Sequence, residues 1–259
     1  MDSMEKEPRV VLVTGGARGI GRAIVEALFD ECCSLCIADV DDKEALATSR
    51  TLDPNEDRVI AQGVDVTSTV QVNSAVTATV EAFGRLDALV NCAGTIDPQP
   101  SQEVPDENWT RLLDVHLNGA FRFCRAAYPH LVAAGSGAIV SISSVSAQQG
   151  IPKRLSYSAA KGAIEAMTRV LAIEWASAGI RVNAVGPGYT MTKRMEGTIA
   201  SGLLDESSVT RLIPLRRFAK PSEIASVVAF LLSEKASYVT GQTFYVDGGV
   251  LANSNWQNQ

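Results

Sequence analysis

Residues 10–21 read VVLVTGGARGIG, an apolar run of strand-forming residues that passes directly into a glycine-rich turn. An apolar helical pattern begins at Gly21, so the segment has the strand, turn and helix order of a dinucleotide-binding turn. Glycines let the backbone approach a pyrophosphate closely, and the free N–H groups at the helix start face its negative charge. Glycines also occur as plain loop residues, but the position directly after a first strand favours the cofactor interpretation.

Six further apolar runs follow along the chain, and they predict strands at residues 35–38, 58–62, 88–90, 138–142, 181–185 and 243–246. Their lack of polar alternation is typical of strands covered by helices on both faces. Helices are predicted at residues 21–29, 70–83, 108–132, 158–176 and 222–232, with Ser222 after Pro221 as a cap. The alternation predicts an α/β fold of Rossmann type: a doubly wound, seven-stranded parallel sheet with helices on both faces.

The chain of 259 residues has no long Pro, Gly or Ser linker, no repeat and no low-complexity tract. A single dinucleotide-binding catalytic domain over residues 1–259 is therefore expected. Residues 190–217 are the least regular segment and are expected to form a lid over the substrate. The C-terminal tail contains Trp256, which either docks on another subunit or is disordered.

The composition excludes several classes of partner. A formal net charge of -6 provides no basic field for nucleic acid or anionic lipid, and no apolar run is long enough to span a bilayer. The polar N-terminus is unlike a signal peptide, so a cytoplasmic location is expected. Cys33 and Cys36 form one C-x-x-C without a second pair, and the only histidines, His116 and His130, lack ligand spacing. No metal is expected.

Asp39 ends the second apolar run, eighteen positions after Gly21. A carboxylate there can accept hydrogen bonds from both hydroxyls of an adenosine ribose, and it would repel the 2′-phosphate of NADP. NAD is therefore the expected cofactor, and NADP is the less favoured one. Two features leave alternatives open: Arg18 within the turn would tolerate NADP, and Asp39 could be an ordinary turn aspartate beside Asp41 and Asp42.

The spacing of the glycine turn, T-G-x-x-x-G-x-G, resembles the short-chain dehydrogenase/reductase family. Further motifs agree in order along residues 9–249: an aspartate in Asp65-Val66-Thr67, an N-N-A-G-like Asn91-Cys92-Ala93-Gly94 in which Cys92 replaces an asparagine, Y-x-x-x-K from Tyr157 to Lys161, a serine thirteen positions earlier at Ser144, a Pro187-Gly188 turn and Val246-Asp247-Gly248-Gly249. Together with the residue-level reading, the resemblance implies cofactor contacts from Thr14, Gly15, Arg18, Gly19, Ile20, Gly21, Asp39, Asp65, Val66, Asn91, Ala93, Gly94, Tyr157, Lys161, Pro187, Gly188, Thr190 and Thr192. Thr190 and Thr192 could equally be helix caps.

Tyr157 and Lys161 are four positions apart, which places them on one face of a helix. A phenol must have its pKa lowered by roughly 3 units to act as a base at neutral pH, and a neighbouring ammonium has the correct sign. In alcohol oxidation Tyr157 would take the hydroxyl proton while Ser144 hydrogen-bonds the same oxygen, and the resemblance implies that Lys161 binds the nicotinamide ribose. The alternative is an amphipathic tyrosine beside a solvated lysine. Ser143 competes with Ser144 but misses the family spacing.

His116 departs from the family pattern, which commonly has asparagine at this position. In the family that asparagine supports a local helix distortion and an ordered water that relays protons from the lysine. An imidazole can also donate and accept, so His116 is a candidate for the relay and is counted with the catalytic residues. A hydrogen-bonded core histidine is the equal alternative. Asn118 faces elsewhere on a regular helix and cannot substitute.

These observations predict an NAD-dependent enzyme that interconverts a secondary alcohol, such as a polyol, sugar, hydroxy acid or cyclic alcohol, and its ketone. Four cations near the site, Lys153, Arg154, Lys193 and Arg194, leave an anionic substrate open. A 3-oxoacyl-thioester reductase that uses NADPH is the alternative, and a catalytically silent NAD-binding regulator is a further one. The resemblance implies a homotetramer built on the two long helices, with contacts from among Phe121, Phe123, Tyr128, Leu171 and Trp175.

Overall fold

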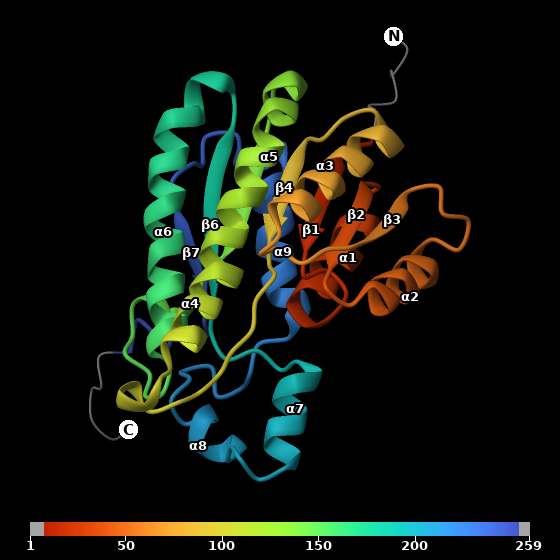
Figure 1. The fold of residues 1–259 in the computed structure, drawn as a ribbon. Coiled ribbons are helices and arrows are strands. Elements are labelled where there is room, and N and C mark those ends of the chain that lie inside the picture. Colours follow the sequence, from red (N-terminus) through yellow and green to blue (C-terminus); the bar gives the residue numbers. More distant parts are fainter. Residues whose placement is uncertain (1–7, 254–259) are drawn as a thin grey trace.

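The computed structural model describes residues 8–253, and a parallel sheet of seven strands runs through its centre in the order β3-β2-β1-β4-β5-β6-β7 (Figure 1). All the predicted strands are present within a residue or two of their expected bounds. They are β1 (Val10–Thr14), β2 (Ser34–Asp39), β3 (Val59–Gly63), β4 (Ala88–Asn91), β5 (Ala138–Ile142), β6 (Arg181–Pro187) and β7 (Thr243–Val246). The predicted α/β fold class is confirmed.

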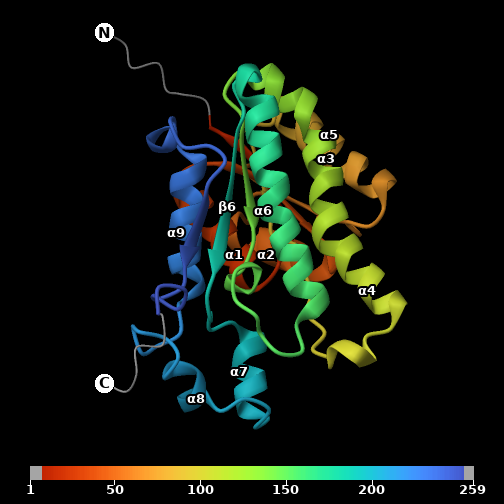
Figure 2. The same ribbon diagram turned by 90° about the vertical axis from the view of Figure 1, so that its left-hand side faces the viewer.

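Helices cover both faces of the sheet, as Figure 2 shows in a view along its edge. The chain contains α1 (Gly19–Asp30), α2 (Asp42–Leu52), α3 (Thr69–Phe83), α4 (Asp106–Leu113), α5 (Gly119–Ala134), α6 (Leu155–Trp175), α7 (Lys193–Ala200), α8 (Glu206–Thr210) and α9 (Pro221–Leu232). One core cluster joins α1, α2 and α9 to the sheet, and another joins α3, α5 and α6 to its opposite face. The helices therefore form two layers with the sheet between them.

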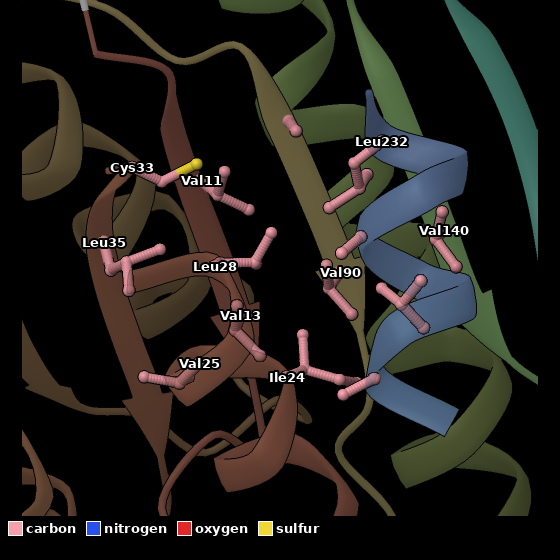
Figure 3. Close-up of a cluster of buried hydrophobic side chains, with 14 of the residues drawn as sticks. Val11, Val13, Ile24, Val25, Leu28, Cys33, Leu35, Val90, Val140 and Leu232 are labelled. Atoms are coloured by element: carbon pink, nitrogen blue, oxygen red, sulfur yellow. The ribbon is translucent and has the colours of Figure 1, made fainter. Parts of the chain in front are cut away.

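The strand residues explain this double covering because successive side chains point to opposite faces. Val11 and Val13 of β1 belong to the cluster beneath α1 and α9, whereas Val10 and Leu12 belong to the cluster on the other side. Figure 3 shows the first cluster, in which Ile24 and Leu28 of α1 meet the strands beside Leu232 of α9. Complete burial of one such side chain stabilises the fold by roughly 1.5–3 kcal/mol.

The strand order reverses between β1 and β4. From β1 the chain builds outward through β2 to β3, then crosses back so that β4 pairs with the other side of β1. In open parallel sheets such a reversal leaves a crevice outside the carboxyl ends of the two strands, and ligands bind there. The glycine turn after β1 and the segment after β4 both lie at this place.

Three expectations about the helices need correction. The single helix expected at residues 108–132 is α4 and α5 joined by a π-helical turn at Asp114–Asn118. Helix α9 begins at Pro221 rather than Ser222, because proline lacks an N–H and fits the first helical position, and the Glu223 side chain accepts from the backbone N–H of Lys220 at 2.7 Å. Helix α2 was not predicted, although Asp41 caps it through the backbone N–H of Glu44.

The segment at residues 190–217 carries α7 and α8, which lie beyond the carboxyl ends of the strands (Figure 1). Within residues 8–253, no helix is long and apolar enough to cross a membrane, and no group of three or more His, Cys, Asp or Glu side chains is arranged to hold a metal ion. The five cysteines are free thiols. Trp256 lies outside the described residues.

Candidate active site

The glycine turn has the shape that its sequence predicts. Gly15 and Gly19 have positive φ angles of 65° and 56°, which favour glycine. A Cβ on Gly21 would lie 2.0 Å from the Gly15 carbonyl oxygen, so the first turn of α1 packs directly against the turn before it. Ile20 is half-buried against the core cluster beneath. Arg18 is the N-cap residue of α1 and makes no side-chain cap, so the N–H groups that begin α1 are open to an anion.

Thr14 joins the two halves of the crevice. Its Oγ1 accepts from the backbone N–H groups of Cys92 at 3.0 Å and Ala93 at 3.1 Å, which fixes the end of β4 to the end of β1. Asn91 donates to Ser141 Oγ at 3.2 Å and to Cys124 Sγ at 3.3 Å, and its Oδ1 is buried without a partner. An unpartnered buried oxygen is costly, so the floor of the crevice has acceptor capacity available for a ligand.

Asp39 lies at the end of β2 beside the glycine turn. Its two carboxylate oxygens accept from the backbone N–H groups of Ala17 at 3.1 Å and Asp41 at 3.0 Å, which orients the group while each oxygen retains acceptor capacity. Arg18 forms an ion pair with Asp41, and its guanidinium lies 3.9 Å from the Glu44 carboxylate. The only arginine of the turn is therefore already held by two carboxylates.

Asp65 and Val66 lie past the end of β3. Asp65 Oδ1 accepts from the backbone N–H of Thr67 at 2.9 Å and from its Oγ1 at 2.7 Å, so this exposed aspartate stabilises its own turn. Val66 packs beneath the start of α5, where a Cβ on Gly119 would lie 2.8 Å from Val66 Cγ2. The structure thus places both residues after β3, on the β2 side of the crevice, where the neighbouring Val64 N–H donates to the Asp39 carbonyl at 2.8 Å.

The segment after β6 closes the opposite side. Pro187 ends β6, and Gly188 lies so close to Asp247 that a Cβ would come within 2.7 Å of its Cα. Thr190 is buried, pairs with the backbone of Ala219 and donates to the Gly188 carbonyl at 3.2 Å. Thr192 is the N-cap of α7, so the cap alternative holds for this threonine; a Cβ on Gly19 would lie 3.5 Å from its Cγ2, so it also faces the glycine turn.

Ser144, Tyr157 and Lys161 converge at the centre of the crevice. Ser144 follows β5, its Oγ accepts from the Ser146 N–H at 3.1 Å, and its hydroxyl acts to lower the pKa of Tyr157. Lys161 is buried, donates from Nζ to the Ile142 carbonyl at 2.7 Å, and lies 5.5 Å from the centre of the Tyr157 ring. Burial lowers the pKa of Lys161 to about 8. The alternative of a solvated Lys161 is wrong because the ammonium lies inside the protein.

The charges around Tyr157 differ from the expectation. Burial raises the pKa of Tyr157 above its ordinary value, and the opposing effects come from the hydrogen bond with Ser144 and from the guanidiniums of Arg154 and Arg194. The Lys161 ammonium, which the sequence predicts as the positive charge beside Tyr157, donates to the Ile142 carbonyl and lies 5.5 Å from the centre of the Tyr157 ring. Arg154 and Arg194 add positive charge that also favours a phenolate.

His116 lies in the π-helical turn and is 3% exposed. Its Nε2 lies 2.6 Å from the Thr95 carbonyl oxygen and 3.2 Å from the Thr95 backbone nitrogen, so this ring nitrogen meets both a backbone acceptor and a backbone donor, and the tautomer decides which bond forms. Nδ1 is buried without a partner. The ring meets Tyr157 edge-on at 5.3 Å, and a Cβ on Gly94 would lie 2.3 Å from His116 Cε1, so glycine at 94 makes room for the imidazole.

Burial and the neighbouring Lys161 lower the pKa of His116 to about 3, and the hydrogen bond to Thr95 opposes this only weakly. The imidazole is therefore neutral at every pH at which the protein would work. The helix distortion that the family places at this position is present with histidine in place of asparagine, because the π-helical turn spans Asp114–Asn118.

Glu165 is a buried charged residue that sequence reasoning missed. Its carboxylate accepts from Ser143 Oγ at 2.7 Å, Gln148 Nε2 at 2.8 Å and the Tyr245 hydroxyl at 2.5 Å. These bonds hold the segment after β5 against α6, which removes Ser143 from competition with Ser144. The spacing could have revealed it, because Tyr157, Lys161 and Glu165 follow one another at intervals of four along a single helix face.

Four features of the site fit a dinucleotide cofactor. They are the crevice at the strand reversal, the open helix N-terminus after the glycine turn, the acceptor carboxylate of Asp39, and the cluster of Tyr157 with the buried Ser144 and Lys161. They define a nicotinamide-dependent oxidoreductase.

Comparison with known proteins assigns the family. A family model described as enoyl-(acyl carrier protein) reductase matches residues 15–251. An uncharacterised oxidoreductase from Methylorubrum extorquens is 39% identical over 94% of this chain and 98% of its own length. The 3-oxoacyl-[acyl-carrier-protein] reductase FabG of Thermotoga maritima is 34% identical over 96% and 100%, and 2-(S)-hydroxypropyl-CoM dehydrogenase 3 of Xanthobacter autotrophicus is 36% identical over 94% and 96%.

Solved structures agree in fold. The protein gox2181 superposes with a TM-score of 0.89 at 36% identity, covering 95% of this chain and 97% of its own. ElxO with NADP bound superposes with a TM-score of 0.90 at 30% identity, covering 95% and 99%. The chain belongs to the short-chain dehydrogenase/reductase family, and it is an NAD(P)-dependent alcohol dehydrogenase or ketone reductase.

Proposed function

We propose that this chain interconverts a secondary alcohol and its ketone with NAD as the preferred cofactor, and that Tyr157 is the acid/base. The observation that carries the proposal is the cluster of Ser144, Tyr157 and Lys161, in which Ser144 favours the ionised form of Tyr157 and the Lys161 ammonium is buried 5.5 Å from the centre of the Tyr157 ring. When bound, the nicotinamide ring accepts or gives the hydride. In oxidation Tyr157 takes the hydroxyl proton, and Ser144 hydrogen-bonds the same oxygen.

Protons leave the site through groups of this chain. Lys161 would hold the nicotinamide ribose and restore the proton balance of Tyr157, and His116 would serve as a neutral relay group. Its Nδ1 is buried without a partner and is available for a further hydrogen bond, while Nε2 is held by the Thr95 backbone. A histidine with this low pKa relays by accepting and donating hydrogen bonds and does not carry a charge.

The test of the chemistry is nicotinamide reduction over a panel of polyols, sugars, hydroxy acids and secondary alcohols, with each of NAD and NADP. Tyr157→Phe keeps the ring that packs on His116 and removes only the reacting hydroxyl, so it is the matched variant. We expect turnover with NAD to fall by roughly 10²–10⁴-fold in Tyr157→Phe. Turnover that persists in Tyr157→Phe would contradict the assigned role.

Asp39 supports the preference for NAD. Its carboxylate is oriented by two backbone N–H groups at the end of β2, and Arg18, the arginine of the glycine turn, is held by Asp41 and Glu44. A 2′-phosphate would meet the repelling Asp39 and would have to draw Arg18 from its partners. We expect Asp39→Ser to lower the ratio of the NADPH dissociation constant to the NADH dissociation constant by at least about 10-fold, as measured by fluorescence titration. An unchanged ratio would place cofactor choice elsewhere.

The second candidate function is reduction of a 3-oxoacyl thioester with NADPH. The relative from Thermotoga maritima, named as a 3-oxoacyl-[acyl-carrier-protein] reductase, favours it, as does ElxO with NADP bound. Acetoacetyl thioester with NADPH therefore belongs in the same panel, and a clear preference for that pair would overturn the NAD proposal. A silent regulator is not favoured by any feature of the site, because the reactive side chains are all assembled.

We also propose a homotetramer that uses α5 and α6 as an interface. Phe121 and Tyr128 are exposed on α5, and Val170 and Ile173 are exposed on α6. Phe123 and Leu171, which the sequence also offers for this contact, are buried in the core. Trp175 is half-buried and packs on the Tyr128 ring. Light scattering coupled to size-exclusion chromatography tests the assembly, with Ile173→Glu expected to disrupt it.

A further inference from the structure

Two arginines flank Tyr157 from different parts of the chain. Arg154 is the N-cap residue of α6, directly before the catalytic helix turn, and Arg194 lies in the first turn of α7. Each guanidinium acts electrostatically on Tyr157, and Arg194 helps to lower the pKa of Arg154, second to burial among the lowering effects. Arg154 is three residues before Tyr157, about one helical turn away. The fold thus brings the charges of two arginines from different segments to bear on the reacting hydroxyl.

The hydrogen-bonding capacity of this pair is largely unused. Arg154 Nη1 is buried and has no hydrogen-bond partner, and the hydrogen bond found for Arg194 runs from Nη2 to the Ile96 carbonyl at 2.7 Å. Within residues 8–253, neither guanidinium forms an ion pair. Other arginines there do pair with carboxylates: Arg18, Arg22, Arg50, Arg85, Arg111, Arg122 and Arg217. Burying an unpaired guanidinium N–H is costly, so Arg154 is suited to an external acceptor, and the exposed Arg194 is free to approach the same acceptor from the solvent side.

We propose that Arg154 and Arg194 bind an oxyanion of the substrate, a carboxylate, sulfonate or phosphate, so that the enzyme acts on a hydroxy acid or a ketone with a nearby anionic group. This proposal rests on the proposed function, because it specifies the substrate of the same site. A guanidinium presents parallel N–H donors that match the oxygens of an oxyanion, and two of them fix its orientation as well as its charge. The anion would thereby direct the adjacent carbonyl toward Ser144 and Tyr157.

The structure also separates these two cations from their neighbours. Lys153 and Lys193 adjoin them in sequence and are exposed, as Arg194 is, yet neither lysine is among the charges that act on Tyr157. Arg194 additionally ties α7 to the segment after β4, since its partner Ile96 is 98 positions earlier in the chain. A bound anion would therefore be held by the catalytic helix and by the segment that carries α7 at once.

The test compares acetoacetate with its neutral analogue methyl acetoacetate, and adds 2-oxopropanesulfonate and 2-oxopropyl phosphate to identify the anion. The variants are Arg154→Met and Arg194→Met, with Lys153→Met and Lys193→Met as matched controls. We expect the wild type to prefer an anionic ketone. The quantity compared is kcat/KM for that ketone divided by kcat/KM for methyl acetoacetate. We expect this ratio to fall at least about 30-fold in each arginine variant and to stay unchanged in the lysine variants.

A binding measurement separates this proposal from the proposed function. Malonate is titrated calorimetrically into the complex of the enzyme with NAD, and NADH affinity is measured in parallel. Weaker malonate binding in the arginine variants with unchanged NADH affinity supports the anion site, even if turnover were to persist in Tyr157→Phe. Equal losses on the acid and the ester, a wild-type preference for the ester, or a loss of NADH affinity would overturn the anion site while leaving the hydride chemistry intact.

Discussion

His116 gives a stability prediction that the structure specifies in sign and size. Burial lowers its pKa to about 3, whereas a histidine in the unfolded chain titrates near 6.5. Between these values the unfolded chain binds a proton that the folded chain refuses, so the stability is fully present above pH 6.5 and is lost as pH falls. Each pH unit costs 1.36 kcal/mol, so from pH 7 to pH 5 the wild type should lose about 2 kcal/mol through this residue alone.

The comparison with His116→Asn isolates this contribution, because asparagine does not titrate and the carboxylates are common to both proteins. Urea unfolding is followed at pH 7 and pH 5, and the free energy of unfolding of each protein is extrapolated to water. The free energy of unfolding of the wild type minus that of His116→Asn should fall by about 2 kcal/mol from pH 7 to pH 5. A difference that stays constant within about 0.5 kcal/mol would show that the folded imidazole is protonated or solvated, and would refute its role as a neutral relay.

Two further perturbations follow from the same kind of reasoning. Burial lowers the pKa of Lys161 to about 8, so the unfolded chain holds a proton between pH 8 and pH 10 that the folded chain has lost. Relative to Lys161→Met, the wild type should therefore gain about 2 kcal/mol of unfolding free energy from pH 8 to pH 10, measured by urea unfolding. Unfolding free energies of the two proteins that change in parallel with pH would contradict the burial of this side chain. Gly21→Ala places a Cβ 2.0 Å from the Gly15 carbonyl and should weaken NADH binding by at least about 10-fold while destabilising the fold by roughly 1–3 kcal/mol. Gly162→Ala, which meets nothing within 4 Å on α6, is its control and should leave NADH affinity unchanged.

The fold could be predicted from the sequence because the buried strands have no polar alternation. Val10 to Val13 and the other apolar runs each form a strand, and their order follows from crossovers that build outward from β1. Helix α2 could not be predicted in the same way. Few of its residues are buried, and it forms because Asp41 caps it and β3 packs against it, which are properties of the folded chain. The π-helical turn at Asp114–Asn118 is likewise invisible to a helical periodicity.

The site was predictable as a set of residues but not as an electrostatic arrangement. The intervals from Ser144 to Tyr157 and from Tyr157 to Lys161 bring the right side chains together. Spacing alone says nothing about which cation acts on the phenol, because that depends on where the Lys161 ammonium points and on where residues 190–217 return to the crevice. Burial raises the pKa of Tyr157, against the expected direction, and the charges of Arg154 and Arg194 oppose that rise.

The positive charge of this crevice stands against the charge of the whole chain. The formal net charge is -6, so at long range the protein repels anions. Inside the crevice, however, Lys161 is buried and Arg154 half-buried, both with lowered pKa values, and Arg154 Nη1 has no partner. Each of these is a cost in the folded state that an anion would relieve. Because a dinucleotide pyrophosphate and a substrate oxyanion are both negative, the unpaired cations couple stability to ligand binding: the protein should be most stable when the full set of anions is bound.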